Sequence, residues 1–149
     1  MRQESRTFFV RALPLFVMLA LSGCHSSGRH TGIPSAAQTA LQAAIDDIDA
    51  GRYDNLYQEA ADEWRNQSSL EESKATLQKM RDKLGNARTR TQQTARDEQT
   101  STAPVAGHSV TVIYQTTFDR GEGIETFTLI ERGGRWALAK YYVSSSGLR

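Results

Sequence analysis

The sequence predicts an α+β domain in which three helices pack on a curved four-stranded antiparallel sheet. Between Ser35 and Gly85, apolar residues recur at the three- and four-residue spacing of amphipathic helices. From Asn86 to Val143 the pattern changes to the two-residue alternation of half-buried strands. Turn-forming residues separate successive strands, which are therefore expected to pair as hairpins. We expect a single domain over residues 34–144 of the 149-residue chain.

The first helix is expected to begin after Pro34 and Ser35 and to end at Gly51. Ser35 is a suitable N-cap, and glycine suits the left-handed position after the last turn. The apolar face of this helix comprises Ala37, Ala40, Leu41, Ala44, Ile45 and Ile48. Three aspartates lie near its C-terminal end, namely Asp46, Asp47 and Asp49. Neighbouring helical aspartates point in different directions and no EF-hand loop is present, so we expect a solvated acidic end and not a metal site.

Two more helices are expected before the sheet. The second covers Tyr53 to about Asn66, and its inward-facing residues are Leu56, Tyr57, Ala60, Ala61 and Trp64. The third follows Ser69, because Ser69 and Glu72 have the spacing of a capping box, and it ends at Gly85. Its apolar contacts come from Leu70, Leu77, Met80 and Leu84.

The first strand is polar from Asn86 onward, which predicts a place at the edge of the sheet. Arg88, Arg90 and Arg96 alternate with small or uncharged residues, and charged side chains discourage pairing with a second sheet. The same arginine row is also a candidate binding surface for phosphate or anionic glycans, because guanidinium groups bind such anions through two hydrogen bonds. Residues 99–107 are expected to form a loop.

The remaining three strands alternate clearly between two faces. The first of them presents Val110, Val112, Tyr114, Thr116 and Phe118 on one face. Residues 119–123 form a turn to a strand that ends at Arg132, and Gly133 and Gly134 can supply the positive φ angles of a two-residue hairpin. The last strand presents Trp136, Leu138, Lys140 and Tyr142 on one face. The tail over residues 145–149 is expected to fray.

The first 33 residues indicate export and attachment to a membrane. Arginines precede an apolar run from Ala12 to Leu21, which is the order of a signal peptide. This run is shorter than the about 20 residues that a membrane-spanning helix needs. It ends in Leu21-Ser22-Gly23-Cys24, which resembles the lipobox of bacterial lipoproteins. The resemblance implies cleavage between Gly23 and Cys24 and acyl chains on the Cys24 sulfur.

This processing predicts a location. Residues 1–23 are the signal peptide, and residues 24–33 are the lipidated cysteine and a flexible Ser-, Gly- and His-rich tether. Two or more acyl chains hold a protein stably on a bilayer, whereas one chain binds only marginally. His25, and not aspartate, follows Cys24, and this resembles lipoproteins that are sorted to the outer membrane. We therefore expect a periplasm-facing protein of the cell envelope, in the outer membrane rather than the inner membrane.

Charge and cysteine content exclude several classes of function. The whole chain has a formal net charge of +1, and removal of a leader with three arginines and one glutamate leaves −1. A nearly neutral domain gives no electrostatic reason to expect a nucleic-acid partner. The single cysteine excludes an intramolecular disulfide and a multi-thiolate metal site. We expect no nucleic acid, metal or cofactor to be bound.

Five short stretches of the mature chain resemble a known family. They are residues 48–53 (IDAGRY), 81–85 (RDKLG) followed by Arg88, 114–118 (YQTTF), 125–129 (ETFTL) and 136–142 (WALAKYY). Their order and spacing resemble the bacterial family called domain of unknown function 4019, within the nuclear-transport-factor-two-like superfamily. The resemblance implies a cone in which a curved sheet closes on the helices, and an envelope location. The family has no established activity.

The expected function is that of a non-catalytic binding or interaction module with an envelope protein or a small ligand as partner. The chain contains no nucleophile elbow, phosphate-binding loop or HExxH zinc motif. One alternative is a pocket enzyme of the ketosteroid-isomerase-like type, whose candidate groups are His108, Tyr114, Asp119, Glu125 and Tyr142. Another is a structural component of the envelope. The second sheet face is a candidate homodimer or partner surface, because it is expected to carry Ile113, Ile130, Tyr141 and Val143.

Overall fold

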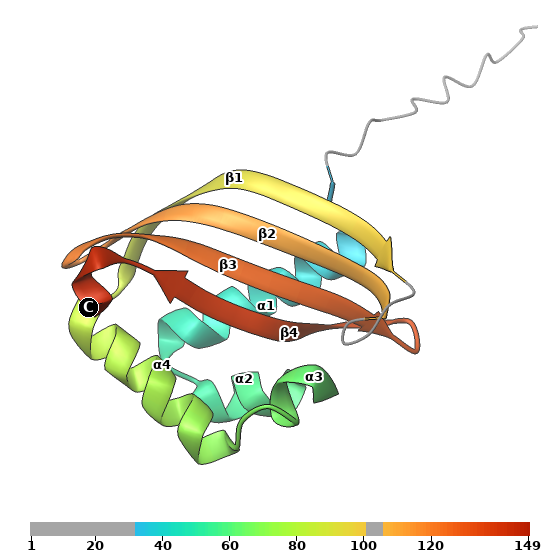
Figure 1. Cartoon of the computed structure of the whole chain (residues 1–149), viewed down its shortest axis with the longest axis horizontal. Helices are drawn as coiled ribbons and strands as arrows, with labels where there is room; N and C mark the ends of the chain where they lie inside the picture. Colours follow the sequence, from blue (N-terminus) through green and yellow to red (C-terminus); the bar gives the residue numbers. More distant parts are fainter. Residues whose placement is uncertain (1–31, 101–105) are drawn as a thin grey trace, which may run out of the picture.

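The computed structural model describes residues 32–100 and 106–149, which form helices packed on one four-stranded sheet (Figure 1). The elements in chain order are α1 (Ser35–Ala50), α2 (Tyr53–Glu59), α3 (Asp62–Arg65), α4 (Leu70–Leu84), β1 (Ala87–Thr100), β2 (Gly107–Phe118), β3 (Gly121–Arg132), β4 (Arg135–Ser144) and a 3-10 helix, η1 (Ser146–Leu148). The predicted signal peptide, its cleavage site, Cys24 and residues 25–31 of the tether lie outside the described residues. Among the helices that the structure describes, none is both long and apolar enough to cross a membrane.

Helix α1 ends as predicted but begins differently. Gly51 has a φ of 69°, and its N–H donates to the carbonyls of Asp47 and Ile48. At the other end, Pro34 and not Ser35 occupies the N-cap position, since the Pro34 carbonyl accepts the Gln38 N–H at 2.9 Å. Ser35 is therefore the first helical residue and makes no side-chain cap.

The predicted second helix is two helices, α2 and α3. Ala60 and Ala61 are extended, with ψ angles of 158°, and they interrupt the helix between Glu59 and Asp62. The break has a specific cause, because the N–H of Ala61 donates to the Leu138 carbonyl of β4 at 2.9 Å. Both alanines are buried, so their small side chains let the backbone approach the sheet. Periodicity alone did not reveal this tertiary hydrogen bond.

Helix α4 has the predicted caps. The Ser69 hydroxyl accepts the Glu72 N–H at 3.3 Å, and the Glu72 carboxylate accepts the Ser69 N–H at 2.9 Å. Gly85 ends the helix with a φ of 80°. Arg120 of the β2–β3 turn adds a cap by donating to the carbonyls of Arg81, Asp82 and Lys83. A cation at this end also complements the helix dipole.

The sheet is antiparallel with the order β1-β2-β3-β4, so β1 is an edge strand as predicted. Gly133 and Gly134 form the β3–β4 turn with φ angles of 59° and 78°, which also agrees with the prediction. The β2–β3 turn is shorter than predicted, because Gly121 already pairs with Phe118.

A β-bulge in β4 places the residues after it on the opposite faces from those predicted. Register with β3 shifts between Leu138 and Lys140, so Ala139 is one extra residue and the residues after it exchange faces. Tyr141 therefore points toward the helices and packs on Phe127 with ring centroids 4.8 Å apart. Tyr142 points away from the helices and is 47% exposed. The assignment of Tyr142 to the inner face and of Tyr141 to the outer face was wrong.

The second sheet face is correspondingly less apolar than predicted. Val143 pairs with Glu125 and lies with Tyr141 on the helix side. Ile130 is fully buried, in a cluster with Ala61 and Ala139. Within the described residues, the single large apolar side chain that is exposed is Tyr142.

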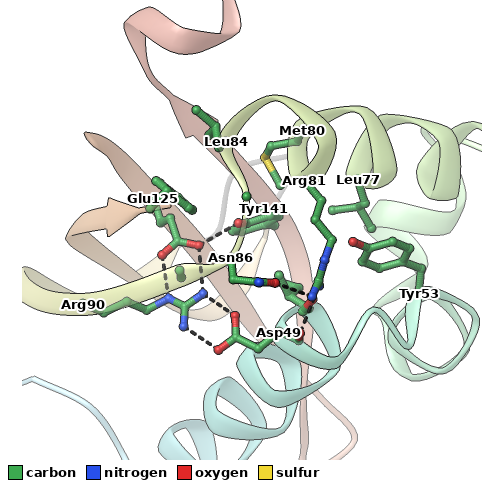
Figure 2. A pocket seen from close by; sticks show the side chains of 14 residues that line it. Asp49, Tyr53, Leu77, Met80, Arg81, Leu84, Asn86, Arg90, Glu125 and Tyr141 are labelled. Atoms are coloured by element: carbon green, nitrogen blue, oxygen red, sulfur yellow. Dashed lines mark hydrogen bonds and ion pairs between the residues drawn. The ribbon is translucent and has the colours of Figure 1, made fainter. Parts of the chain in front are cut away.

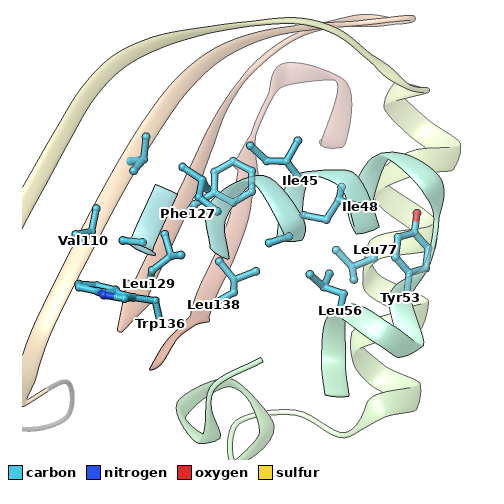
Figure 3. Packing of buried hydrophobic residues seen from close by; sticks show 14 residues of the cluster. Ile45, Ile48, Tyr53, Leu56, Leu77, Val110, Phe127, Leu129, Trp136 and Leu138 are labelled. Atoms are coloured by element: carbon cyan, nitrogen blue, oxygen red, sulfur yellow. The ribbon is translucent and has the colours of Figure 1, made fainter. Parts of the chain in front are cut away.

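The core fills the space between the sheet and helices α1, α2 and α4 (Figure 3). Ile45 and Ile48 of α1, Leu56 of α2 and Leu77 of α4 meet side chains of three strands. The strand residues of this cluster are Val110, Val112, Phe127, Leu129, Trp136 and Leu138. Most of the interior of the fold is therefore occupied by side chains.

The C-terminal residues, for which we expected fraying, form the ordered turn η1. The Ser145 hydroxyl accepts the Gly147 N–H at 3.2 Å, and Lys83 of α4 donates to the Leu148 carbonyl at 3.0 Å. Gly147 also lies close to Leu84, so a polar tail is held against the end of α4.

Candidate functional site

A small pocket lies where the C-terminal ends of α1 and α4 meet the inner face of the sheet (Figure 2). Its apolar wall comes from Ile48, Tyr53, Leu77, Met80, Leu84 and Phe118. Its polar side is formed by Asp49, Arg90, Glu125 and Tyr141. The cavity volume is about 30 Å³. This volume holds one or two water molecules and no larger ligand.

Glu125 is the central polar group, and it has no exposed surface. The alternation of β3 turns it inward beside Phe127, so a carboxylate enters an otherwise apolar layer. One carboxylate oxygen accepts from Arg90 Nε and from the Thr116 hydroxyl, both at 2.6 Å. The other oxygen accepts from the Tyr141 hydroxyl at 2.7 Å and from Arg90 Nη2 at 3.3 Å. The buried charge is thus paired and hydrogen-bonded on both oxygens, which burial requires.

Arg90 links this carboxylate to α1. Its Nη1 and Nη2 donate to the two carboxylate oxygens of Asp49, each at 2.7 Å, while its Nε donates to Glu125. The Arg90 side chain is only 14% exposed. Burial disfavours the charged guanidinium, but the hydrogen bonds to Asp49 and Glu125 outweigh it, so the pKa of Arg90 lies above its ordinary value. Arg90 therefore stays a cation, and it bridges two carboxylates and balances one of their two negative charges.

Tyr141 and Thr116 complete the hydrogen bonding of Glu125. Burial, followed by the charge of Glu125, raises the pKa of Tyr141 well above that of an ordinary tyrosine. The Tyr141 hydroxyl is therefore a fixed donor. The alternation of the sequence predicted Tyr141 on the second sheet face, because the bulge at Ala139 that turns it inward has no local sequence signal. Glu125 was among the predicted catalytic candidates, and it lies two residues from Phe127 on the buried side of β3.

The acidic end of α1 differs from the prediction of a solvated end. Asp47 is buried and accepts from Arg52 Nε at 2.8 Å and from Asn55 Nδ2 at 2.6 Å, which fixes the corner between α1 and α2. Asp49 binds Arg90, and its own carbonyl accepts from Arg81 at 2.9 Å. These aspartates have structural partners, and no cluster of three or more metal-ligating side chains occurs among the described residues.

The other predicted catalytic candidates do not converge on Glu125, except for Tyr114. Tyr114 pairs with Glu125 across β2 and β3, and burial raises its pKa. Asp119 lies in the β2–β3 turn, where the Asn86 N–H and Arg88 hold its pKa below the usual value. Tyr142 points away from the helices. The fifth candidate, His108, lies in a separate cluster.

His108 joins three strands next to the core. Its Nδ1 lies 2.9 Å from the Glu131 carboxylate of β3, and its Nε2 lies 2.6 Å from the Asp97 carboxylate of β1. These hydrogen bonds, to Glu131 first and Asp97 second, raise the pKa of His108. The ring also packs edge-on against Trp136 with centroids 4.7 Å apart. These contacts give His108 a structural role in holding the strands together.

The structure separates the three arginines of the proposed anion-binding row. Register shifts at Arg88 and Gln93 interrupt the alternation of β1. Arg88 is paired with Asp119, and Arg90 is buried against Asp49 and Glu125. Arg96 is exposed, with its nearest carboxylate, that of Glu98, at 3.6 Å. Anion binding by this row stays a prediction.

A larger hollow lies outside the core, in the groove between β4 and helices α3 and α4. We call it the β4 groove. It has a volume of about 470 Å³ and is lined by Trp64, Ser73, Thr76, Leu77, Lys140 and Tyr141, together with their neighbours Gln67, Ser68, Glu72 and Ala139. Its wall is held by internal hydrogen bonds, because Trp64 Nε1 donates to the Ser73 hydroxyl at 3.0 Å and the Ser68 and Ser73 hydroxyls lie 2.7 Å apart.

Comparison with known proteins places the chain in a family. Residues 38–141 match the model of a family described as "Protein of unknown function (DUF4019)". The match covers most of α1, all of α2 to β3, and β4 as far as Tyr141, so it includes both the Glu125 cluster and the β4 groove. No match was found among curated proteins. Because the family model spans most of the sequence, the chain belongs to the DUF4019 family.

Proposed function

We propose that this protein is a lipid-anchored module of the cell envelope that binds a partner and carries out no catalysis. The anchor rests on the sequence Leu21-Ser22-Gly23-Cys24, with acyl chains on Cys24. His25 favours the outer membrane, with the folded domain facing the periplasm. The tether over residues 24–33 would let the domain reach up to about 30 Å from the bilayer surface.

The hydrogen bonding of Glu125 supports the proposal that the protein carries out no catalysis, because both carboxylate oxygens already accept hydrogen bonds. A general base needs a free lone pair within hydrogen-bond reach of a substrate. Glu125 instead accepts hydrogen bonds from Arg90, Thr116 and Tyr141, and the adjoining cavity has a volume of about 30 Å³. A ketosteroid-isomerase-like reaction would require that cavity to open and Glu125 to lose its ion pair. Binding at the surface requires neither change.

The fold supports membership of the nuclear-transport-factor-two-like superfamily, in which a curved sheet closes on helices as a cone. Figure 1 shows the sheet arching over α1, with α2 and α4 beneath it. In this structure the interior of such a cone is filled by the core and the ion pairs, so the β4 groove becomes the main candidate for a contact surface. A purely structural role in the envelope is the second non-catalytic option.

The anchor is tested by labelling cells with palmitate and fractionating their membranes. The wild-type chain should incorporate the label and sediment with the outer membrane, whereas Cys24→Ala should do neither. Labelling of Cys24→Ala, or an unmodified Cys24 in the mature protein, would refute the anchor.

Partner binding is tested by placing a photo-crosslinking amino acid at Thr76, which lines the β4 groove, in cells that carry the full chain. Gln78 on the opposite side of α4 is the matched control, because it is exposed and its amide donates to Asp82 of the same helix. An adduct of defined mass at Thr76 and not at Gln78 is expected. Equal adducts at both positions, or none at either, would contradict binding in the groove.

A further inference from the structure

The outer edge of β4 is only partly covered. β4 is the last strand of the sheet that the described residues form, so within this part of the chain one of its edges has no strand partner. The extended residues Ala60 and Ala61 reach this edge at Leu138, whose carbonyl accepts the Ala61 N–H at 2.9 Å. Beyond Leu138, no backbone hydrogen bond joins the edge to another element among the described residues.

The register identifies the free backbone groups. In a strand, successive residues direct their N–H and C=O groups to opposite edges. The Leu138 carbonyl points away from β3, toward Ala61, and the extra residue Ala139 then resets the alternation so that Lys140 pairs with Thr128. Tyr141 and Val143 consequently direct their N–H and C=O groups outward. No further register shift occurs between Lys140 and Ser144, so this part of the edge is regular.

The β4 groove lies beside the first of these two residues, since Tyr141 lines it. Ala139, Lys140 and Tyr141 form one side of the groove, and the first two turns of α4 form the other. Five residues of strand, from Ala139 to Val143, correspond to about 17 Å of extended chain. The volume of about 470 Å³ suits one added strand. The helical wall stands beside the edge and obstructs the approach of a second sheet, which disfavours pairing between two copies of this chain.

The lining of the groove defines the chemistry of its occupant. Glu72 and Lys140 contribute one charge of each sign, and the remaining polar groups are hydroxyls and an amide from Ser68, Ser73, Thr76 and Gln67. Trp64, Leu77 and Tyr141 add apolar surface. A strand added to an edge obtains affinity from backbone hydrogen bonds, while alternate side chains enter pockets beside it. The groove thus fits an uncharged extended segment with an apolar side chain at alternate positions.

We propose that the free edge of β4 binds an extended, uncharged segment of a partner protein, which adds to the sheet as a fifth strand. This inference rests on the proposed function, because it names the kind of partner that the anchored module binds. The segment pairs with the backbone of Tyr141 and Val143, and its apolar side chain lies between β4 and α4.

The test uses the purified full chain in detergent and a random library of uncharged octapeptides. Peptides selected on the wild type should slow hydrogen exchange of the Tyr141 and Val143 amides, measured by nuclear magnetic resonance. Thr76→Trp fills the groove and should weaken binding by about ten-fold or more. Gln78→Trp, an equally large change on the other side of α4, should leave affinity unchanged. Val143→Pro removes one outward N–H at an edge position where proline is tolerated, and should also weaken binding.

Three results would overturn the inference. The first is selection of no peptide at all. The second is binding that neither protects these amides nor responds to Thr76→Trp. The third is concentration-dependent protection of Tyr141 and Val143 without any peptide, which would show that a second copy of the chain occupies the edge. These outcomes are independent of the anchor, since a wild-type chain that takes up no palmitate would refute the membrane attachment and leave peptide binding in solution unchanged.

Discussion

Removal of the cation from the buried cluster is the most demanding test of the structure. Arg90→Met retains an unbranched stem of similar volume and leaves Glu125, with no exposed surface, holding only its hydrogen bonds from Thr116 and Tyr141. Removing one partner of a buried ion pair typically costs about 3–5 kcal/mol. The contact with Asp49 adds little, because that carboxylate is 41% exposed and exposed pairs contribute about 0–1 kcal/mol. The expected loss in the free energy of unfolding is therefore about 3–5 kcal/mol at neutral pH.

Urea unfolding followed by the fluorescence of Trp64 and Trp136 measures this loss. Asp49→Asn is the matched control and should cost less than about 1 kcal/mol. Adding Glu125→Gln to Arg90→Met removes the unpaired charge, so the double variant should be more stable than Arg90→Met alone.

The result that would refute this reasoning is a small loss of stability. A cost below about 1 kcal/mol in Arg90→Met would show that the buried Glu125 carboxylate does not depend on Arg90 for its charge.

Three further perturbations test other parts of the fold. His108→Gln should reduce stability most below pH about 6.5 and least at alkaline pH. The reason is that the pKa of His108 is raised in the folded state, so its contribution to stability disappears as the pH rises through that pKa. Equal losses in urea unfolding at pH 6 and pH 9 would contradict the ion pairing. Gly85→Ala should reduce the free energy of unfolding by about 1–3 kcal/mol or more, since φ is 80° and a Cβ would lie 2.5 Å from Asp119 Cβ. Gly133→Ala, with open space around its Cβ, is the milder control. Equal urea midpoints for the two variants would refute the clash. Trp136→Ala should cost about 3–5 kcal/mol because its ring is in the core, and an unchanged melting temperature would contradict that position.

The sequence predicted the ends of helices and the β3–β4 turn correctly where a residue determines its own backbone conformation without a tertiary partner. Gly51, Gly85 and the pair Gly133–Gly134 end helices or form a turn because few other residues adopt their positive φ angles. The capping box at Ser69 is likewise a four-residue signal that needs no tertiary partner. The break at Ala60–Ala61 escaped prediction because alanine is a strong helix former. Its cause is a hydrogen bond to a strand more than seventy residues later, which no local pattern contains.

The candidate site was predicted in pieces and not as a cluster. Arg90 appeared as part of a surface row and Glu125 as a scattered catalytic candidate, while Asp49 appeared as part of a solvated helix end. Each of these descriptions treats a charge as though its partner were water. In the structure the three side chains satisfy one another, and the contact joins α1, β1 and β3. Pairing at separations of 35 and 41 residues depends on the register of the sheet, which periodicity does not specify.

The bulge at Ala139 connects the interior of the protein with its outer edge. It turns Tyr141 inward, so that the hydroxyl reaches Glu125, and it also directs the backbone groups of Tyr141 away from β3. Without the extra residue, Tyr142 would face the carboxylate and the free edge would shift by one residue. The side chain of Tyr141 is thus fixed by the buried cluster while its backbone borders the β4 groove. A rigid edge residue of this kind reduces the entropy that strand addition has to overcome, which favours the groove as the place where a partner binds.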